Sequence, residues 1–342
     1  MTAHQPPNVF IVGSPKCGTS AFAHYLAAHP DVFFAKKEMH FFGSDLRFGP
    51  QFYRRDWSAY LAEFDACNGQ ACVGEASVWY LFSHQAAVEI KAFNPDARII
   101  ILLREPVAML YSLYHQFRAD GNEHLPTFKE ALAAEDDRRA GRRITRQTYF
   151  PQGLVYRATA RYTEQVQRYF DAFGRERVHV IIYEAFAADP AGTYCDTLTF
   201  LGLDSNHTDI NFQPINGNHS VRSPALRAFL NDPLVRGTAI ALHSWLPHSA
   251  FTMLQTIGDR LGDFNTRPEK RSPLAQDLRL SLQREFAPEV ERLSTLLGRD
   301  LTHWSNLQPP VAGDLSRSVS LPDAQVCLPS SNMLHQSGGS FD

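Results

Sequence analysis

Several features are rare or missing in this sequence of 342 residues, and their absence argues against some classes of protein. The five cysteines, at positions 17, 67, 72, 195 and 327, form no CxxC pair and no spacing typical of zinc ligands. No uninterrupted apolar run approaches the ~20 residues that span a bilayer, and the start MTAHQPPNVF lacks the pattern of a signal peptide. Because scattered thiols of odd number suit a reducing compartment, we expect a cytoplasmic protein.

Charge of one sign is also lacking. The 33 Lys and Arg residues against 36 Asp and Glu residues give a net charge of −3. This balance argues against non-specific binding of nucleic acid, so we expect no nucleic-acid partner and only local phosphate sites. A hydrophobic content of 44% and an aromatic content of 12% are instead those of a globular protein.

Apolar runs and helical patterns alternate along the chain up to about residue 203. The runs predict strands and the helical patterns predict helices, with strands at 8–12, 32–35, 72–75, 98–103 and 178–183 and helices at 19–29, 83–93, 106–117, 127–143, 156–173 and 189–203. This order predicts an α/β fold, a P-loop-like doubly wound parallel sheet flanked by helices, with ligands at the carboxyl ends of the strands.

The pattern changes after Asn218, where the strands stop. Residues 224–262 look helical and apolar, and residues 273–297 predict an amphipathic helix. From Gln308 onward the composition shifts to Pro, Ser and Gly, which predicts a disordered tail. We therefore predict a single domain over residues 1–307, with an α/β core at about 8–222, a helical C-terminal part at 223–307 and the tail at 308–342.

The stretch VGSPKCGTS joins the first predicted strand to the first predicted helix. Gly13 and Gly18 have the separation of the Walker A pattern G-x-x-x-x-G-K-[ST], but Thr19 follows the second glycine and the lysine lies inside the loop, at Lys16. Unpaired N–H groups at the start of a helix favour an anion, and the hydroxyls of Thr19 and Ser20 and the ammonium of Lys16 add donors. The stretch predicts a phosphate-binding loop, against the alternative of an ordinary turn with a surface lysine.

The strand RIIILL (98–103) argues against an NTPase. Such an enzyme needs an aspartate at the end of this strand to hold magnesium, and Arg104 stands there instead. A cation at this place predicts a second anionic group on the ligand, and no metal. Ser112, two turns into the next helix, could face back toward Arg104 or be an ordinary polar residue of the helix.

A resemblance to the two nucleotide motifs of the sulfotransferases is carried by VGSPKCGTSAFAHYL (12–26) and IIILLREPVAMLYSLYHQF (99–117). It covers roughly residues 8–222 and, more faintly, LGRDLTHW (297–304). The resemblance implies that 3′-phosphoadenosine 5′-phosphosulfate (PAPS) is the co-substrate and that 3′-phosphoadenosine 5′-phosphate (PAP) is the product. Transfer of the sulfuryl group to an acceptor hydroxyl then proceeds by in-line displacement and requires no metal.

The resemblance also implies roles for matching residues. Those of the first loop, which holds the 5′-phosphosulfate, are Lys16, Cys17, Gly18, Thr19 and Ser20. Arg104 and Ser112 match the residues that grip the 3′-phosphate, and Arg222, in NGNHSVRSPAL, matches a later basic loop that reaches the same phosphate. Cys17 differs from the residue in the animal enzymes but contributes mainly its backbone. Lys16 lies where charge develops on the bridging oxygen, which makes it catalytic.

The segment AKKEMHFF resembles the Glu-x-His-Phe-Phe segment of the heparan-type sulfotransferases, whose glutamate is held to be the base. We therefore predict Glu38 as the base that takes the acceptor's proton. The alternative is a structural carboxylate paired with Lys36 or Lys37. His40 either orients the base or acceptor, or is itself the base, as in the small-molecule sulfotransferases. Glu75, in VGEASVWYL, is a second carboxylate that could be the base or contact the substrate.

The acceptor is predicted less sharply, as a hydroxyl of a carbohydrate, a glycolipid or another small molecule. A basic cluster either ends a solvated helix or meets an anionic acceptor, and its members are Arg138, Arg139, Arg142, Arg143 and Arg146. The apolar segment 224–262 either packs internally or makes a peripheral membrane contact. The rival functions are a P-loop nucleotide kinase or NTPase and a non-catalytic nucleotide-binding protein. The oligomeric state is not predicted.

Overall fold

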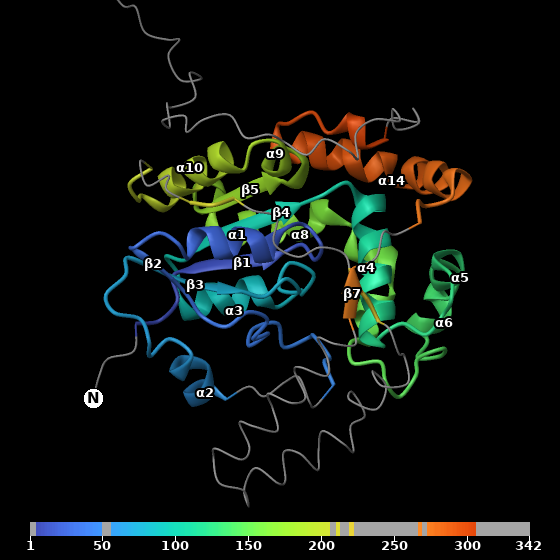
Figure 1. Ribbon diagram of the computed structural model, residues 1–342, viewed down its shortest axis with the longest axis horizontal. Coiled ribbons are helices and arrows are strands. Elements are labelled where there is room, and N and C mark those ends of the chain that lie inside the picture. The colour runs from blue at the N-terminus through green and yellow to red at the C-terminus, as the bar shows by residue number, and fades with distance from the viewer. Residues whose placement is uncertain are drawn as a thin grey trace, which may run out of the picture.

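The structure of the protein is a computed structural model. It describes residues 5–49, 56–205, 210–212, 219–221, 266–268 and 272–305. Figure 1 shows a twisted sheet between helices, and its strand order is β2-β3-β1-β4-β5. The strands are β1 (Val9–Gly13), β2 (Val32–Phe34), β3 (Cys72–Ala76), β4 (Arg98–Leu103) and β5 (Val178–Ile182). Every neighbouring pair in this sheet is parallel. The predicted parallel α/β sheet is therefore confirmed.

Helices fill most of the remaining described chain. They are α1 (Thr19–Leu26), α2 (Trp57–Ala62), α3 (Ala86–Phe93), α4 (Pro106–Asp120), α5 (Phe128–Ala133), α6 (Glu135–Arg139), α7 (Tyr156–Thr159), α8 (Tyr162–Phe173), α9 (Tyr183–Ala188), α10 (Pro190–Leu201) and α14 (Gln276–Leu297). Short 3-10 turns occur at Pro151–Leu154, Arg175–Arg177 and Thr302–Ser305. A small antiparallel pair, β6 (His219–Val221) and β7 (Thr266–Pro268), lies beside α4.

The sheet is covered on both faces. The chain runs from β1 through α1 to β2 in one direction and from β3 through α3 to β4 in the other, so right-handed crossovers place α1 and α3 on opposite faces. Helix α10 packs on α1, and α8 packs on α3, β4 and β5. Strand β1 is buried throughout, and β4 is buried beyond Arg98. This double cover explains why these strands are continuous apolar runs without polar alternation.

Two predicted helices are each broken in two. The segment 127–143 forms α5 and α6, which meet at Ala134, and the segment 156–173 forms α7 and α8. Between α7 and α8, the side chain of Gln165 donates to the carbonyls of Ala158 (3.1 Å) and Thr159 (3.3 Å). These side-chain bonds satisfy two carbonyls that a continuous helix would bond through backbone N–H groups.

The C-terminal predictions are tested only in part. Helix α14 confirms the amphipathic helix predicted at 273–297, and it packs against α8 and α4, above the sheet in Figure 1. The apolar segment 224–262, Arg222 and the tail at 308–342 lie outside the described residues. Among the helices that the structure describes, none combines the length and apolar character needed to cross a membrane.

Candidate active site

The predicted phosphate loop lies at the carboxyl end of β1, between the ends of β3 and β4. Gly18 has a φ of 83° in the left-handed region and forms the N-cap of α1, where no side chain caps the helix and no acidic residue occupies the first turn. The first N–H groups of α1 therefore lack a side-chain partner and retain the positive end of the helix dipole. This arrangement suits an anion held at the start of α1.

The start of the loop continues from β1 and is held by a backbone hydrogen bond to β4. The N–H of Ser14 donates to the carbonyl of Leu102 at 2.6 Å. Cys17 is fully buried, and burial raises the pKa of its thiol to about 12, so that side chain is a neutral core residue. Thr19 is buried as well, whereas Lys16 and Ser20 are half-buried. Lys16 has a φ of 62°, which is uncommon for a residue with a side chain.

Arg104 lies beside this loop, directly after β4. Its Nη1 donates to the carbonyl of Lys16 at 3.3 Å, and its guanidinium stacks 4.5 Å from the ring centroid of Tyr183. The two contacts hold a permanent positive charge close to the phosphate loop. Ser112 is buried within α4.

The segment with the predicted base runs along the end of β3. The N–H of Glu38 donates to the carbonyl of Ala76 at 2.9 Å, and the N–H of His40 donates to Oγ of Ser77 at 3.1 Å. Glu38 and His40 have φ values of 60° and 49°, in a region that non-glycine residues seldom adopt. Strain of this kind persists only where neighbouring bonds hold the backbone, and it is concentrated at functional sites.

One turn, which follows β3, contacts both the loop and this segment. The carbonyl oxygen of Val78 is so close to Gly13 that an added Cβ on Gly13 would lie 2.5 Å from it. The N–H of Val78 donates to Oε2 of Glu38 at 3.2 Å. The N–H of Leu81 donates to the carbonyl of Val12 at 2.7 Å. The phosphate loop and Glu38 are thereby held on the same rigid support.

The carboxylate of Glu38 has three polar neighbours. Besides the N–H of Val78, these are Nε2 of His40, 3.4 Å from Oε2, and Nζ of Lys37, 3.7 Å from Oε1. Partial burial raises the pKa of Glu38, while the Lys37 ammonium and the Val78 N–H oppose that rise. A carboxylate with a raised pKa that remains 36% exposed suits a base that takes a proton from an acceptor.

His40 is a buried and neutral neighbour of Glu38. Burial lowers its pKa to about 3, and its ring stacks on Phe48 with the centroids 4.3 Å apart. Nε2 faces the Glu38 carboxylate, so the favourable tautomer carries its proton on this nitrogen. Nδ1 is buried and has no hydrogen-bond partner among the described residues. The geometry fits an imidazole that orients Glu38.

Glu75 does not lie where a substrate could reach it. It is fully buried, and it accepts hydrogen bonds from the hydroxyls of Tyr60 (2.6 Å), Tyr80 (2.5 Å) and Ser77 (2.9 Å). Burial raises its pKa to about 7, against the lowering effect of these three bonds. The structure therefore contradicts the predicted substrate contact. The hydroxyls of Ser77 and Tyr80 also accept the N–H groups of His40 and Phe42, so Glu75 supports the segment of the base from beneath.

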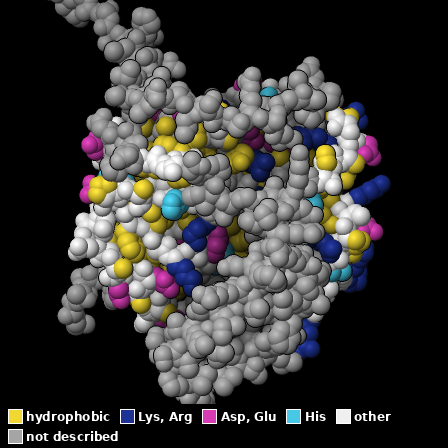
Figure 2. Space-filling model, viewed as in Figure 1, with side chains coloured by type: hydrophobic (Ala, Val, Ile, Leu, Met, Phe, Trp, Pro, Cys, Tyr) yellow, Lys and Arg dark blue, Asp and Glu magenta, His cyan; other side chains and the backbone are white. Residues whose placement is uncertain are grey.

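Lys37 is a neighbour of the site whose role the sequence did not indicate. Its Nζ donates to Oγ of Ser20, in the first turn of α1, at 2.5 Å. From sequence, Lys37 is expected only as a structural partner of Glu38. The signal that was available is its position between a predicted strand and the Glu-x-His segment, at the same sheet edge as the phosphate loop. Figure 2 shows basic and acidic side chains next to one another near the centre of one face.

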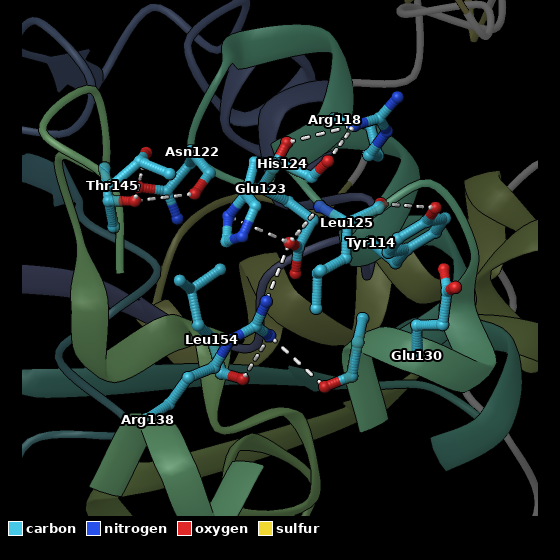
Figure 3. A network of polar contacts seen from close by, with 12 residues as sticks. Tyr114, Arg118, Asn122, Glu123, His124, Leu125, Glu130, Arg138, Thr145 and Leu154 are labelled. Carbon is cyan, nitrogen blue, oxygen red and sulfur yellow. Dashed lines mark hydrogen bonds and ion pairs between the residues drawn. The ribbon is translucent and has the colours of Figure 1, made fainter. Parts of the chain in front are cut away.

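The basic cluster divides into buried and exposed members. Arg138 is buried and pairs with the equally buried Glu123 at 2.7 Å, as Figure 3 shows. Its Nη1 also donates to the carbonyls of Ala131 (3.2 Å) and Leu154 (3.1 Å). Both interpretations of this arginine, as a solvated helix end or as a contact to an anionic acceptor, are therefore wrong, because its guanidinium joins core elements. The exposed Arg139 and Arg142 pair with neighbouring aspartates, as a solvated helix end would.

Metal ligands do not gather in the described part of the chain, where no group of three or more His, Cys, Asp or Glu side chains is placed to hold an ion.

Three comparisons relate the chain to known proteins. Residues 6–230 match the family described as the sulfotransferase domain. The crystal structure of a sulfotransferase from Alicyclobacillus acidocaldarius has a TM-score of 0.64 and 34% sequence identity, covering 88% of this chain and 100% of that one. Human heparan sulfate glucosamine 3-O-sulfotransferase 3B1 is 29% identical over 208 residues, which are 61% of this chain and 49% of the human protein.

A third relative, the membrane-associated sulfotransferase kil1 of Dictyostelium discoideum, is 31% identical over 110 residues, which are 32% of this chain and 22% of the relative. The chain thus spans about half the length of the human relative. The family match covers more than half of this chain and includes both nucleotide motifs and the Glu38 segment. The chain belongs to the sulfotransferase family.

Proposed function

We propose that this protein transfers the sulfuryl group of PAPS to a hydroxyl of a carbohydrate. One observation carries this proposal: two features lie at the same edge of the sheet. The first is the start of α1, which no side chain caps and which lies beside Lys16 and Arg104, and the second is Glu38 with its neighbour His40. The first half suits a phosphosulfate, and the second suits removal of a hydroxyl proton. The family membership supports PAPS as the donor, and the relatives named for heparan sulfate support a sugar acceptor.

In this mechanism the acceptor oxygen attacks sulfur while its proton passes to the carboxylate of Glu38. The bond between sulfur and the bridging oxygen breaks, and its electron pair remains on the 5′-phosphate of PAP. The ammonium of Lys16 stabilises the charge that develops on that oxygen, so its contribution is made in the transition state. His40 fixes the orientation of Glu38, and Arg104 contributes positive charge beside the nucleotide. The predicted roles of Ser112 and Arg222 at the 3′-phosphate stay predictions, as does the cytoplasmic location.

The nucleotide can be tested without an acceptor. PAP should raise the thermal midpoint of the protein, because a ligand at 100 times its Kd stabilises the native state by about 2.7 kcal/mol. ATP with magnesium provides the matched comparison, since Arg104 and not an aspartate follows β4. Stabilisation by ATP and magnesium without stabilisation by PAP would refute the proposal and favour a nucleotide kinase or NTPase.

The acceptor is tested by transfer of radiolabelled sulfate from PAPS. Desulfated heparan oligosaccharides should accept label, and a simple phenol should not. Label on the phenol alone would refute the carbohydrate part of the proposal while leaving the donor part intact. Binding of PAP with no transfer to any hydroxyl would instead favour the non-catalytic nucleotide-binding protein.

A further inference from the structure

Lys37 connects the two halves of the proposed active site. Its Nζ lies 2.5 Å from Oγ of Ser20 and 3.7 Å from Oε1 of Glu38. Ser20 is the second residue of α1, next to the loop that contains Lys16, whereas Glu38 lies on the acceptor side. The ammonium of Lys37 is therefore placed between the start of α1 and the carboxylate of Glu38.

The surroundings of this ammonium leave it able to bind an anion. A lysine ammonium carries three donors, and the hydroxyl of Ser20 is the one acceptor within hydrogen-bonding distance among the described residues. The contact with Glu38 is longer and mainly electrostatic. The side chain of Lys37 is 30% exposed, so a bound substrate can reach it. Lys36, the preceding residue, is exposed, and among the described residues no hydrogen bond or ion pair joins its side chain to either half.

We propose that Lys37 is a second cationic catalytic residue, whose ammonium contacts the non-bridging oxygens of the sulfuryl group as that group moves from the phosphate loop to the acceptor. The inference rests on the proposed function. Lys16 stabilises the leaving oxygen, Glu38 takes the acceptor's proton, and Lys37 keeps all its protons while it holds the transferred group. Two cations then flank the reacting sulfur from different sides, which suits a transfer that depends on positioning and on charge.

A second effect of Lys37 reaches the base itself. Its positive charge opposes the rise that burial causes in the pKa of Glu38. Loss of this charge should raise the pKa of Glu38 further, so more of the base would be protonated at a given pH. The acidic limb of the rate profile should then move to higher pH, and a merely structural lysine would not cause that movement.

The test compares Lys37→Met with Lys36→Met, which removes the same charge one residue away. Lys37→Met should lower kcat about 100-fold, the effect of losing one group that stabilises a transition state. It should also move the acidic limb of the kcat profile upward. PAP lacks the sulfuryl group, so the Kd for PAP should change less than about threefold. Lys36→Met should alter none of the three, and Lys37→Arg, which keeps the charge, should restore the acidic limb.

Several outcomes would overturn this inference. A kcat of Lys37→Met within twofold of the wild type would show that the ammonium does not act in the reaction. A loss of PAP affinity as large as the loss of kcat would assign Lys37 to the nucleotide. If the wild-type protein neither binds PAP nor transfers sulfate, the proposed function fails and this inference fails with it. PAP binding by Lys37→Met also establishes that the variant is folded.

Discussion

The buried carboxylate of Glu75 should make the stability of the protein depend on pH, and Glu75→Gln should remove that dependence. Glu75 has no exposed surface, and burial raises its pKa from 4.5 to about 7. The native state therefore holds a proton that the unfolded chain releases. Stability contributed by this group is fully present below pH 4.5 and is lost as the pH rises through 7.

The magnitude follows from the two pKa values. At about 1.4 kcal/mol for each pKa unit, the change from 4.5 to about 7 corresponds to about 3 kcal/mol. Glutamine resembles the protonated form, because its amide oxygen can accept from Ser77 and Tyr80 while its NH2 group donates to Tyr60. We expect the variant and the wild type to be similarly stable near pH 4.5, and the variant to be more stable by about 3 kcal/mol above pH 7.5.

The assay is urea denaturation of both proteins between pH 4 and pH 9, with the difference in unfolding free energy plotted against pH. Differences between variants are used because other titrating groups then cancel. Glu63→Gln, an exposed carboxylate at the end of α2, is the matched control and should follow the wild type throughout. A difference for Glu75→Gln that varies by less than about 0.5 kcal/mol over this range would refute the reasoning, since Glu75 would then titrate alike in both states.

Other residues allow matched comparisons. Arg138→Met should lower the free energy of unfolding by about 3–5 kcal/mol, because it removes the guanidinium that pairs with the buried carboxylate of Glu123. In the same urea titration, Arg139→Met at an exposed position should lower it by less than about 1 kcal/mol. Equal losses for the two variants would contradict a structural role for Arg138. Gly18→Ala and Gly121→Ala both place a side chain at a positive φ, and each should lower the free energy of unfolding by about 1–2 kcal/mol. Only Gly18→Ala should weaken PAP binding measured by calorimetry. Its Cβ would lie 3.1 Å from Phe186 beside the loop, whereas a Cβ on Gly121 would have no atom within 4 Å. Glu38→Gln should abolish sulfate transfer and retain PAP binding, and residual turnover near the wild-type rate would move the base to His40.

The sheet could be predicted from sequence because its strands are buried on both faces. The runs NVFIV, RIIILL and VHVIIY give the bounds of β1, β4 and β5 to within a residue. The breaks between α5 and α6 and between α7 and α8 could not be predicted in this way. Polar bonds near these breaks are not encoded in the apolar pattern, such as those from Gln165 to the carbonyls of Ala158 and Thr159 and from the N–H of Arg157 to Glu135.

The candidate site could also be predicted from sequence only in part. The sequence pointed to Lys16 and Glu38 because each lies in a motif directly after a strand, and parallel strands bring such motifs to one edge. The roles predicted for Arg138 were wrong, because its partners lie far away in the sequence. Glu123 precedes it by 15 residues, and the carbonyl of Leu154 follows it by 16. The sequence indicated no catalytic role for Lys37, because the contact with Ser20 joins residues that are 17 positions apart.

The two oxygens of Glu75 have different tasks, and this division determines what happens when the group is protonated. Oε1 accepts the hydroxyls of Ser77 and Tyr80, which in turn hold the N–H groups of His40 and Phe42. Oε2 accepts only the hydroxyl of Tyr60 among the described residues. A proton is therefore accommodated on Oε2, where Tyr60 needs only to rotate its hydroxyl hydrogen and become an acceptor. The direction of every bond that leads to the base segment is kept, so this buried acid can change charge without moving the base above it.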